Sequence, residues 1–453
     1  MRQTRRSARA AVLLTALTLG VAVLPLGPAA AQADEVTIER YAGENRYATA
    51  RLIAEDTFTE VERVLIAKAE DWPDALAGGY LAGLLGSPVL LVSRDGVQAA
   101  TLQALESLEA DAVTLLGGPG AISAASSEAL QDAGYDVDRV FGPTRYETSV
   151  AVALHGDEND VGLWDGQRTA IVATGEQYAD ALVASAVAFS EAFPVLLTPS
   201  AQLHPAVAGA LVDLDIERVI LPGGAAAVSP AVEDEIEDLG IEVRRVRQEG
   251  GGRWETALAF ADFATTEFGY TRAHIDLATG LGFADALVMG PHAGTGKAPL
   301  LLTPGTEPSL PGSLDDWLRL HSCEIESAHI AGGAAVVSPA NADATKAAAE
   351  DCEERSEVRI DETNVTPGQV VQALFTVPDE TALRAISVAG PCVLSGDIWN
   401  SDTSGVAAAA DDILASFAVH ADADPGSCRV QFTLHHFDGT SIELTRVLMV
   451  RET

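Results

Sequence analysis

The residues of this chain with the clearest capacity for binding chemistry are arginines, aromatic residues and aspartates that recur at fixed positions. The string Arg-x-x-Gly-x-x-Arg-aromatic-x-Thr occurs three times, and its second arginine and the following aromatic residue are Arg46 and Tyr47, Arg145 and Tyr146, and Arg253 and Trp254. The string aromatic-x-Asp-Ala-Leu also occurs three times, with the aspartates Asp74, Asp180 and Asp285. A guanidinium group offers a fixed fork of donors to an anion. An aromatic face and a carboxylate suit the stacking and hydroxyl binding of a sugar.

Each of these residue sets also has a structural interpretation. The aspartates stand where helices are expected to begin, so they can act as caps at the positive helix ends, with the preceding aromatic residue as a hydrophobic staple. The arginines recur in a chain with 28 basic and 66 acidic side chains. They can pair with the repeated aspartates or hold an anionic ligand, and the sequence leaves both alternatives open.

Two further strings repeat in the same order. One is a proline followed by apolar residues, of which the proline and the two closing leucines are Pro88, Leu90 and Leu91; Pro194, Leu196 and Leu197; and Pro299, Leu301 and Leu302. The other is a Gly-Gly pair followed by a serine, and it begins at Gly117, Gly223 and Gly332. Its glycines can form a sharp turn or a ligand-binding nest at strand ends. The repeated aspartates stand 180 − 74 = 106 and 285 − 180 = 105 residues apart, so the chain contains three copies of one module.

Within a module, short apolar runs alternate with helical segments. The expected elements of the first copy are strands at 61–67, 88–92 and 112–116, helices at 74–85 and 97–108, and then a helix near Ser123 and a strand near Val137. The helix at 74–85 is rich in glycine and alanine, which allows close packing. Continuous apolar strands between helices indicate a parallel sheet covered on both faces. Each module is therefore predicted to be a Rossmann-like α/β unit.

The two ends of the chain have a different character. A basic start, an apolar run at 10–26 and the small residues before Asp34 predict a secretory signal peptide at 1–33. Residues 356–453 show strand-like runs at 370–377, 383–388, 413–419, 428–434 and 442–450. These runs predict a small β-sandwich, with an immunoglobulin-like fold as one candidate for it, and the segment 406–410 is also compatible with a helical turn.

The charge and the cysteines narrow the functional classes. The formal net charge is −38, and removing the four arginines of residues 1–33 gives −38 − 4 = −42 for the mature chain. Nucleic acid is therefore not an expected partner, and no later apolar stretch is long enough for an integral membrane protein. In an exported chain the four cysteines should be paired, and Cys323–Cys352 with Cys392–Cys428 is the economical choice among three pairings.

Catalytic patterns are scarce in the sequence. We find no Gly-x-Ser-x-Gly, no His-Glu-x-x-His and no paired-cysteine metal box. None of the nine histidines recurs at the same place in every module. We therefore expect no cofactor and no catalytic residue, and three parallel copies favour binding over catalysis because avidity benefits from repetition.

The four repeated strings together resemble the type 2 cell-wall-binding repeat of Gram-positive surface proteins, over residues 36–350. The expected domains are three repeat modules at 34–140, 141–248 and 249–355 and the β domain at 356–453. The resemblance implies a pseudo-threefold arrangement of the modules and non-covalent binding of an anionic secondary cell-wall polymer. It ties the proline–leucine string to anchoring. The chain departs from the family at the position before the second arginine, where Asn45, Thr144 and Gly252 replace the usual acid.

This resemblance predicts an exported wall-anchored protein that displays its C-terminal β domain to a partner of unknown identity. The alternative from another class is a cell-wall hydrolase, amidase-like or peptidase-like, because some relatives fuse these repeats to such enzymes. Cations could bridge the acidic chain to an anionic wall, but the sequence contains no Ca²⁺ loop.

Overall fold

The computed structural model describes residues 35–156, 160–247 and 251–352 in the region of the repeats. In the C-terminal region it describes 357–360, 364–376, 383–400, 412–420, 426–436 and 441–450. The predicted signal peptide and the possible helical turn at 406–410 lie outside these ranges. Among the described residues, no helix combines the length and the apolar character needed to cross a membrane.

The first module has alternating strands and helices around a four-stranded parallel sheet with the order β3-β2-β4-β5. Its elements are α1 (Arg46–Thr57), β2 (Arg63–Lys68), α2 (Gly78–Leu85), β3 (Val89–Val92), α3 (Ala99–Ser107), β4 (Ala112–Leu116), α4 (Ala124–Asp132) and β5 (Asp136–Val140). The sheet is apolar because its strands β2, β3 and β4 are almost entirely buried. This arrangement confirms the predicted Rossmann-like unit.

The second and third modules repeat this topology. The second contains α5 (Arg145–Ala153), β6 (Leu163–Trp164), β7 (Gln167–Thr174), α6 (Ala179–Ser190), β8 (Val195–Thr198), α7 (Pro205–Asp213), β9 (Arg218–Pro222), α8 (Pro230–Glu237) and β10 (Glu242–Val246). The third contains α9 (Arg253–Phe268), β11 (His274–Thr279), α10 (Ala284–Gly296), β12 (Leu300–Thr303), α11 (Gly312–Leu320), β13 (Ser327–Ala331) and α12 (Pro339–Ala349). The short strand β6 pairs antiparallel with β7 and is an addition to the common pattern.

The fourth strand of the third sheet comes from the start of the chain. Strand β1 (Thr37–Tyr41) pairs in parallel with β13, so the third sheet has the order β1-β13-β11-β12. The sequence placed residues 37–41 in the first module. The strand instead occupies the position that β5 and β10 hold in the other two sheets, and the chain then continues into α1 of the first module. In each module, the first helix therefore directly follows, along the chain, the strand at the edge of the neighbouring sheet.

Local sequence explains where several helices begin. The side chain of Asn45 accepts hydrogen bonds from the backbone at the start of α1, and Ser123 does the same for α4. Pro230 and Pro339 occupy the first turns of α8 and α12, where the fixed φ of proline suits a helix start. The predicted helix at 74–85 starts later than expected, at Gly78, because residues 74–77 form a turn between β2 and α2.

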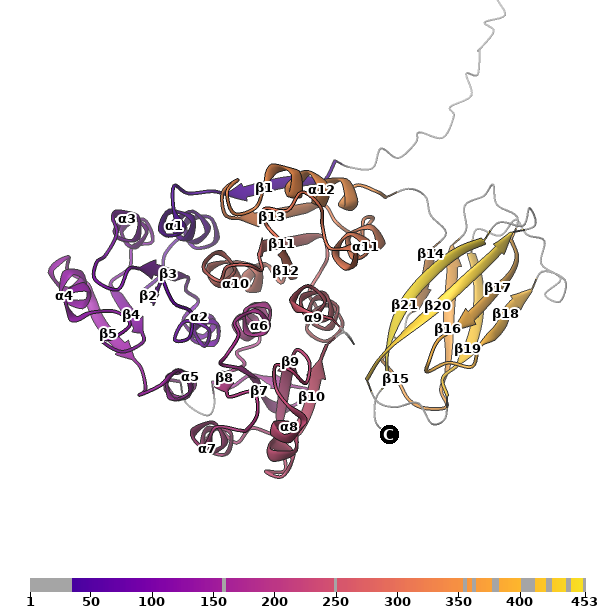
Figure 1. The fold of residues 1–453 in the computed structure, drawn as a ribbon, viewed down its shortest axis with the longest axis horizontal. Helices are drawn as coiled ribbons and strands as arrows, with labels where there is room; N and C mark the ends of the chain where they lie inside the picture. The colour runs from indigo at the N-terminus through magenta and orange to yellow at the C-terminus, as the bar shows by residue number, and fades with distance from the viewer. Residues whose placement is uncertain are drawn as a thin grey trace, which may run out of the picture. The chain divides into compact units, whose positions relative to one another are not determined.

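The three modules meet through the central helices α2, α6 and α10, each of which packs against the other two (Figure 1). Small residues make this approach possible. A methyl group added at Gly83 would lie 2.1 Å from the carbonyl oxygen of Phe189, and one at Gly294 would lie 2.7 Å from the carbonyl oxygen of Ala186. The cyclic contacts agree with the pseudo-threefold arrangement that the resemblance implied.

Replacing Arg40 with Gln should weaken the closure of this ring. Arg40 Nη1 on β1 donates to the carbonyl oxygens of Gly332 at 2.9 Å and Val337 at 3.0 Å. Both bonds are partly buried and charge-assisted, so we expect the free energy of unfolding to fall by about 2 kcal/mol in chemical denaturation. The control is Arg94→Gln, because the ion pair of Arg94 with Asp95 is exposed. An equal loss in the two variants would contradict a specific role for Arg40.

The C-terminal region forms two β-sheets with a hydrophobic core between them. The first has the order β14-β16-β19 and the second the order β15-β21-β20-β17-β18. Their bounds are β14 (Glu357–Ile360), β15 (Asn364–Val365), β16 (Val370–Thr376), β17 (Leu383–Ala389), β18 (Gly396–Asn400), β19 (Asp412–Ala418), β20 (Gly426–His436) and β21 (Ser441–Val450). Phe432 of the second sheet lies edge-on to Phe375 and Phe417 of the first, with ring centroids 5.3 and 5.4 Å away. The predicted β-sandwich is confirmed, and β14, β15 and β18 are strands that the sequence pattern missed.

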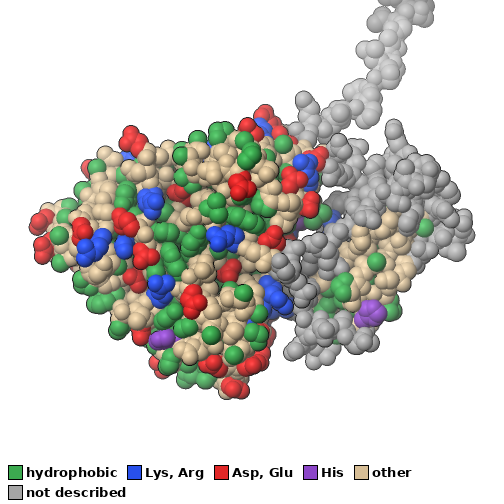
Figure 2. Space-filling model, in the orientation of Figure 1, with side chains coloured by type: hydrophobic (Ala, Val, Ile, Leu, Met, Phe, Trp, Pro, Cys, Tyr) green, Lys and Arg blue, Asp and Glu red, His purple; other side chains and the backbone are tan. Residues whose placement is uncertain are grey.

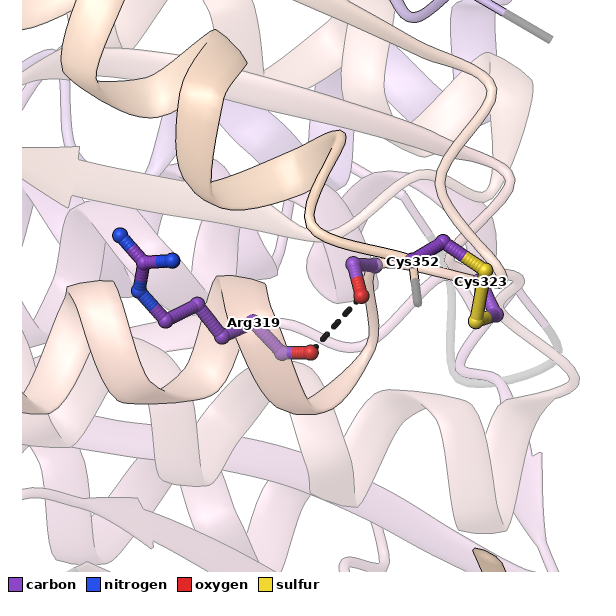
Figure 3. The surroundings of a disulfide bond; sticks show 4 residues. Arg319, Cys323 and Cys352 are labelled. Atoms are coloured by element: carbon purple, nitrogen blue, oxygen red, sulfur yellow. Dashed lines mark hydrogen bonds between the residues drawn. A yellow bond between two sulfur atoms is a disulfide. The ribbon is translucent and has the colours of Figure 1, made fainter. Parts of the chain in front are cut away.

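Both predicted disulfides are present in the structure. Cys323 and Cys352 join the turn after α11 to the segment after α12, close to Arg319 (Figure 3). Cys392 and Cys428 join the segment before β18 to β20 within the β-sandwich. Each bond therefore closes a loop inside one domain, which was the basis of the predicted pairing.

Candidate functional site

The repeated aspartates lie at the carboxyl ends of parallel strands. Asp74 follows β2, and its Oδ2 would meet a methyl group added at Gly117, the first residue after β4, at 2.5 Å. Asp180 and Asp285 stand in the same relation to Gly223 and Gly332. The chain crosses from one side of β2 to the other between β3 and β4, so this is the topological switch point where open α/β sheets bind ligands.

The first glycine of each Gly-Gly pair is required here for two physical reasons. Gly117 has a φ of +106°, a conformation that favours glycine, and Gly223 and Gly332 share it. A side chain at any of the three would also strike the neighbouring carboxylate. The pair therefore forms the sharp turn that the sequence suggested, and it places the turn directly against the aspartate.

The aspartates are not helix caps, which corrects one interpretation of the sequence. The N-cap residues of α6 and α10 are the aromatic residues Tyr178 and Phe283, whereas Asp180 and Asp285 lie in the first turns, where the helix dipole favours their charge. The hydroxyls of Thr148 and Thr256 instead lie near Asp74 and Asp180 and favour the ionised form of each carboxyl. Each of these threonines belongs to the next module along the chain.

The repeated arginines follow the same cyclic pattern. The positive charge of Arg145 favours the ionised form of Asp74, Arg253 that of Asp180, and Arg46 that of Asp285. The third relation joins the first module to the last, so the three aspartates and three arginines alternate around the ring of modules. The sequence suggested an arginine–aspartate relation but could not show that it crosses module boundaries.

Each arginine also binds the backbone of its own module. Arg145 Nη1 donates to the carbonyl oxygen of Gly175 at 2.6 Å, and Arg46 and Arg253 donate to those of Ala69 and Gly280. These carbonyl groups directly follow β2, β7 and β11. The guanidinium groups are thus held at the strand ends, beside the switch points.

Aromatic residues of the preceding module lie beneath two of these guanidinium groups. The guanidinium carbon of Arg145 is 4.9 Å from the ring centroid of Trp72, and that of Arg253 is 5.6 Å from Tyr178. Trp72 and Tyr178 also contact each other, with centroids 6.0 Å apart, and Tyr178 lies 6.4 Å from Phe283. We call Trp72, Tyr178 and Phe283 the aromatic cluster; it gathers one half-buried ring from each module.

Burial changes the ionisation of the aspartates. Desolvation raises the pKa of Asp180 to about 6, against the opposing effects of Thr256 and Arg253. Desolvation also raises the pKa of Asp74 and of Asp285. A carboxylate with a raised pKa in a ligand-binding position is a common feature of functional sites.

An open cleft of about 410 Å³ lies at the boundary between the first two modules. One wall is the loop at 118–121 that follows β4, and the other is the segment at 141–145 that enters α5. The cleft contains two cationic side chains, Lys68 and Arg145, and two acidic ones, Asp71 and Asp74. It can therefore offer donors to an anion and acceptors to hydroxyl groups.

The aromatic residues that follow the repeated arginines pack against the strand ends. Gly175 has no room for a side chain, because a methyl group there would lie 2.6 Å from the ring of Tyr146, and Gly280 stands in the same relation to Trp254 at 2.4 Å. The hydroxyl of Tyr47 donates to Glu70 at 3.0 Å, and burial and this carboxylate raise the pKa of Tyr47 to about 12. These contacts support the fold, and each ring remains partly exposed.

The proline–leucine string cannot contact a polymer directly, which corrects its assignment as a ligand-binding set. Its leucines lie in β3, β8 and β12, and none is more than 1 % exposed: Leu90, Leu91, Leu196, Leu197, Leu301 and Leu302. Pro88, Pro194 and Pro299 immediately precede these strands. Each strand packs against the central helix of another module, β3 against α10, β8 against α2 and β12 against α6. The string therefore helps to hold the modules together.

The first arginine of the repeated string needs a correction in the third copy. Arg40 and Arg139 lie next to last in β1 and β5 and donate to the carbonyl oxygens of Gly332 and Gly117. The residue that lies next to last in β10 and donates to Gly223 is Arg245, not the predicted Arg247. Between this arginine and Arg253 the chain has two more residues than the other copies have at this place, so the string matched at Arg247 instead of Arg245.

Sequence reasoning missed the contributions of Lys68 and of the threonines. Thr148 and Thr256 were visible as the last residue of the repeated string, which was a usable signal. Lys68 does not recur in the other copies, where Thr174 and Thr279 end the strand, so repetition could not identify it.

Figure 2 shows basic and acidic side chains around a largely hydrophobic area on one face of the repeats.

Comparisons with known proteins agree with this architecture. The chain is 23% identical over 269 residues to N-acetylmuramoyl-L-alanine amidase LytC of Bacillus subtilis (strain 168), covering 59% of this chain and 51% of LytC. It is 29% identical over 218 residues to the Amidase enhancer of the same organism, covering 48% of this chain and 28% of that protein. The chain thus spans about half of LytC and less of the second relative.

A solved structure shows the same fold. Cwp8 from Clostridium difficile superposes with a TM-score of 0.60 at 23% identity, over 70% of this chain and 53% of Cwp8. The cell wall binding domain 2 (CWB2) family matches three tandem segments, at residues 40–127, 139–233 and 247–341. The three modules with their shared strings are therefore members of one established repeat type, and the chain belongs to the cell wall binding domain 2 family.

Proposed function

We propose that this protein is exported, binds an anionic polymer of the cell wall through its three repeats and displays the C-terminal β-sandwich at the cell surface. The observation that carries the proposal is the cleft between the first two modules, where Lys68 and Arg145 lie beside the aspartates of a switch point. The membership of the CWB2 family supports the wall as the target.

The charge of the chain restricts how such a polymer can bind. After removal of residues 1–33 the formal net charge is −38 − 4 = −42, and a protein of this charge repels a polyanion at long range. This repulsion is screened within about 8–10 Å at ordinary ionic strength, whereas a contact with a partly buried arginine is screened much less. Local pockets such as the cleft must therefore supply the attraction, and moderate salt or divalent cations should strengthen binding before high salt weakens it.

Replacing Arg46, Arg145 and Arg253 together with Gln should weaken binding to purified wall polymer at least tenfold. The three side chains lie at equivalent switch points, so the triple variant removes one cationic group from each. Binding is measured by co-sedimentation with purified walls over a range of salt concentrations, on protein whose folding is checked by circular dichroism.

The matched control removes the same charge elsewhere, with Arg63, Arg168 and Arg319 replaced by Gln. These arginines make ion pairs with acids on the surface, one in each module, and none lines the cleft. The control should bind as the wild type does. Intact binding by the folded fraction of the first variant, together with a large fall in its melting temperature, would assign the three arginines to the fold alone.

A cell-wall hydrolase is the second candidate, favoured by the similarity to LytC. A zymogram with purified walls separates the two functions. Clearing of the wall substrate by the purified protein would favour the hydrolase, and binding without clearing would favour the anchor.

A further inference from the structure

The third module contains a polar cluster inside its core that is unrelated to the repeated strings. Asp276 on β11 is fully buried, and its two carboxylate oxygens each face a histidine. Oδ2 lies 2.8 Å from Nδ1 of His292 on α10, and Oδ1 lies 3.1 Å from Nδ1 of His329 on β13. One ligand atom from each of the three residues lies within 4.8 Å of the other two.

The other two modules show what these positions hold in an ordinary core. Asp276 pairs with Leu300 in the sheet, and Leu65 and Ile171 make the same pairing with Val89 and Val195. The strand partner His329 corresponds to Thr114 and Ile220, and His292, seven residues after Asp285, corresponds to Leu81 and Val187. All six of these counterparts are buried, and five are apolar. In the third module, three side chains that are able to bind a metal thus occupy positions that are mostly apolar core in the other two modules.

The hydrogen bonds around His292 leave a positive charge to be supplied. Tyr41 of β1 donates its hydroxyl proton to Asp56 at 2.6 Å, so the Tyr41 oxygen can only accept from His292 Nε2, which lies 3.2 Å away. His292 would then have to donate from both ring nitrogens to satisfy Tyr41 and Asp276 together. Either an imidazolium ring or a cation bound at Nδ1 meets this demand, and with a bound cation the ring needs a proton only on Nε2.

We propose that Asp276, His292 and His329 bind a divalent transition-metal ion of the Zn²⁺ class, with both histidines coordinating through Nδ1. Two imidazoles and one carboxylate are a donor set that Zn²⁺ accepts. Tetrahedral bonds of about 2.0–2.2 Å separate neighbouring ligand atoms by roughly 3.3–3.6 Å, so small side-chain shifts from the two distances above would admit an ion. The site differs from the proposed polymer cleft in both its residues and its module.

Strand β1 supplies the outer partners of this site. Metal-bound histidines usually donate their second ring nitrogen to an oxygen atom that fixes the ring. Tyr41 takes this role for His292, and Glu39 lies 3.8 Å from Nε2 of His329. Because β1 is the strand that closes the ring of modules, the ion would stiffen the closure. The side chains of His292 and His329 are 12% and 20% exposed, so an ion can reach them.

The test is titration calorimetry of the full chain with Zn²⁺ after treatment with EDTA, in excess Mg²⁺ that occupies the surface carboxylates. We expect one strong site per chain. The triple variant Asp276→Ile, His292→Val, His329→Ile copies the core of the second module and should lower Zn²⁺ affinity at least a hundredfold. Tyr41→Phe should lower it about tenfold to a hundredfold, as the loss of an outer partner does.

Two further variants keep the outcome decisive. His204→Val removes a histidine that stacks on Tyr146 in the second module and should leave Zn²⁺ binding unchanged. His329→Gln keeps a polar side chain of similar size, and its affinity is decisive if the triple variant fails to fold. Absence of a strong Zn²⁺ site in the wild type, or an undiminished site in the triple variant and in His329→Gln, would overturn the proposal. Wall binding is measured separately, so the failure of either proposal leaves the other standing.

Discussion

Replacing Gly83 with alanine is expected to lower the free energy of unfolding of the repeats by about 3 kcal/mol, at the upper end of the usual cost of overpacking. The added methyl group would lie 2.1 Å from the carbonyl oxygen of Phe189, which is backbone of the neighbouring helix and cannot rotate away. The two helices must therefore separate, and α2, α6 and α10 share one packed centre. Chemical denaturation followed by circular dichroism measures the loss.

Gly296→Ala is the matched control for this substitution. Gly296 is the last residue of α10, and an added methyl group there meets nothing within 4 Å. Alanine at this helix end should leave stability unchanged or raise it slightly. A loss at Gly83 no larger than at Gly296 would show that the central helices tolerate a wider spacing than the structure has.

The packing of the three central helices explains why the three copies have different residues at the position of Gly83. Counting from the repeated aspartates, Gly83, Phe189 and Gly294 are equivalent, each nine residues after its aspartate. Phe189 contacts both glycine positions, so two small residues accommodate one large residue where three large residues would collide. The glycines in the predicted helix at 74–85 indicated close packing, but the partner that requires it could not be read from one module.

The secondary structure of each module could be predicted well from the sequence because it depends mainly on residues that are close together in the chain. Continuous apolar strands, helix caps such as Ser123 and the turn at Gly117 each depend on neighbouring residues, and all three were placed correctly. Contacts between modules were not predictable in this way. The pairing of β1 with β13 joins residues about 290 positions apart, and no local pattern in 37–41 distinguishes this pairing from one within the first module.

The candidate site shows the same difference between features that the local sequence predicts and contacts that cross module boundaries. Repetition identified Arg145 and Asp74 as important, and the structure shows that they come from different modules and meet at a switch point. Repetition also selected Leu90 and its counterparts, which are buried, because a repeated residue can serve assembly as well as binding. The cluster around Asp276 escaped a search for repeated residues because it occurs in one module alone.

Replacing Asp180 with asparagine is expected to stabilise the protein above pH 6 by about 3 kcal/mol. The pKa of this carboxyl rises from 3.8 to about 6 on folding because of burial, a shift of about two units worth about 1.4 kcal/mol each. The folded state therefore binds a proton more tightly than the unfolded state. Wild-type stability from this group is full below pH 3.8, falls as the pH rises toward 6 and is lost above it. Asparagine stays neutral at every pH, so it avoids the loss.

The measurement is the free energy of unfolding of wild type and variant between pH 3.5 and 8, with Asp213→Asn as the control at an exposed carboxylate of the same module. The gain of Asp180→Asn should vanish below pH 4 and the control should show no gain. Equal stability of variant and wild type at every pH would mean that Arg253 and Thr256 fully compensate the buried charge. A confirmed gain would show that the repeats keep an aspartate that weakens their own fold at neutral pH. A destabilising carboxylate at three equivalent switch points would then support the proposed binding of a polymer there.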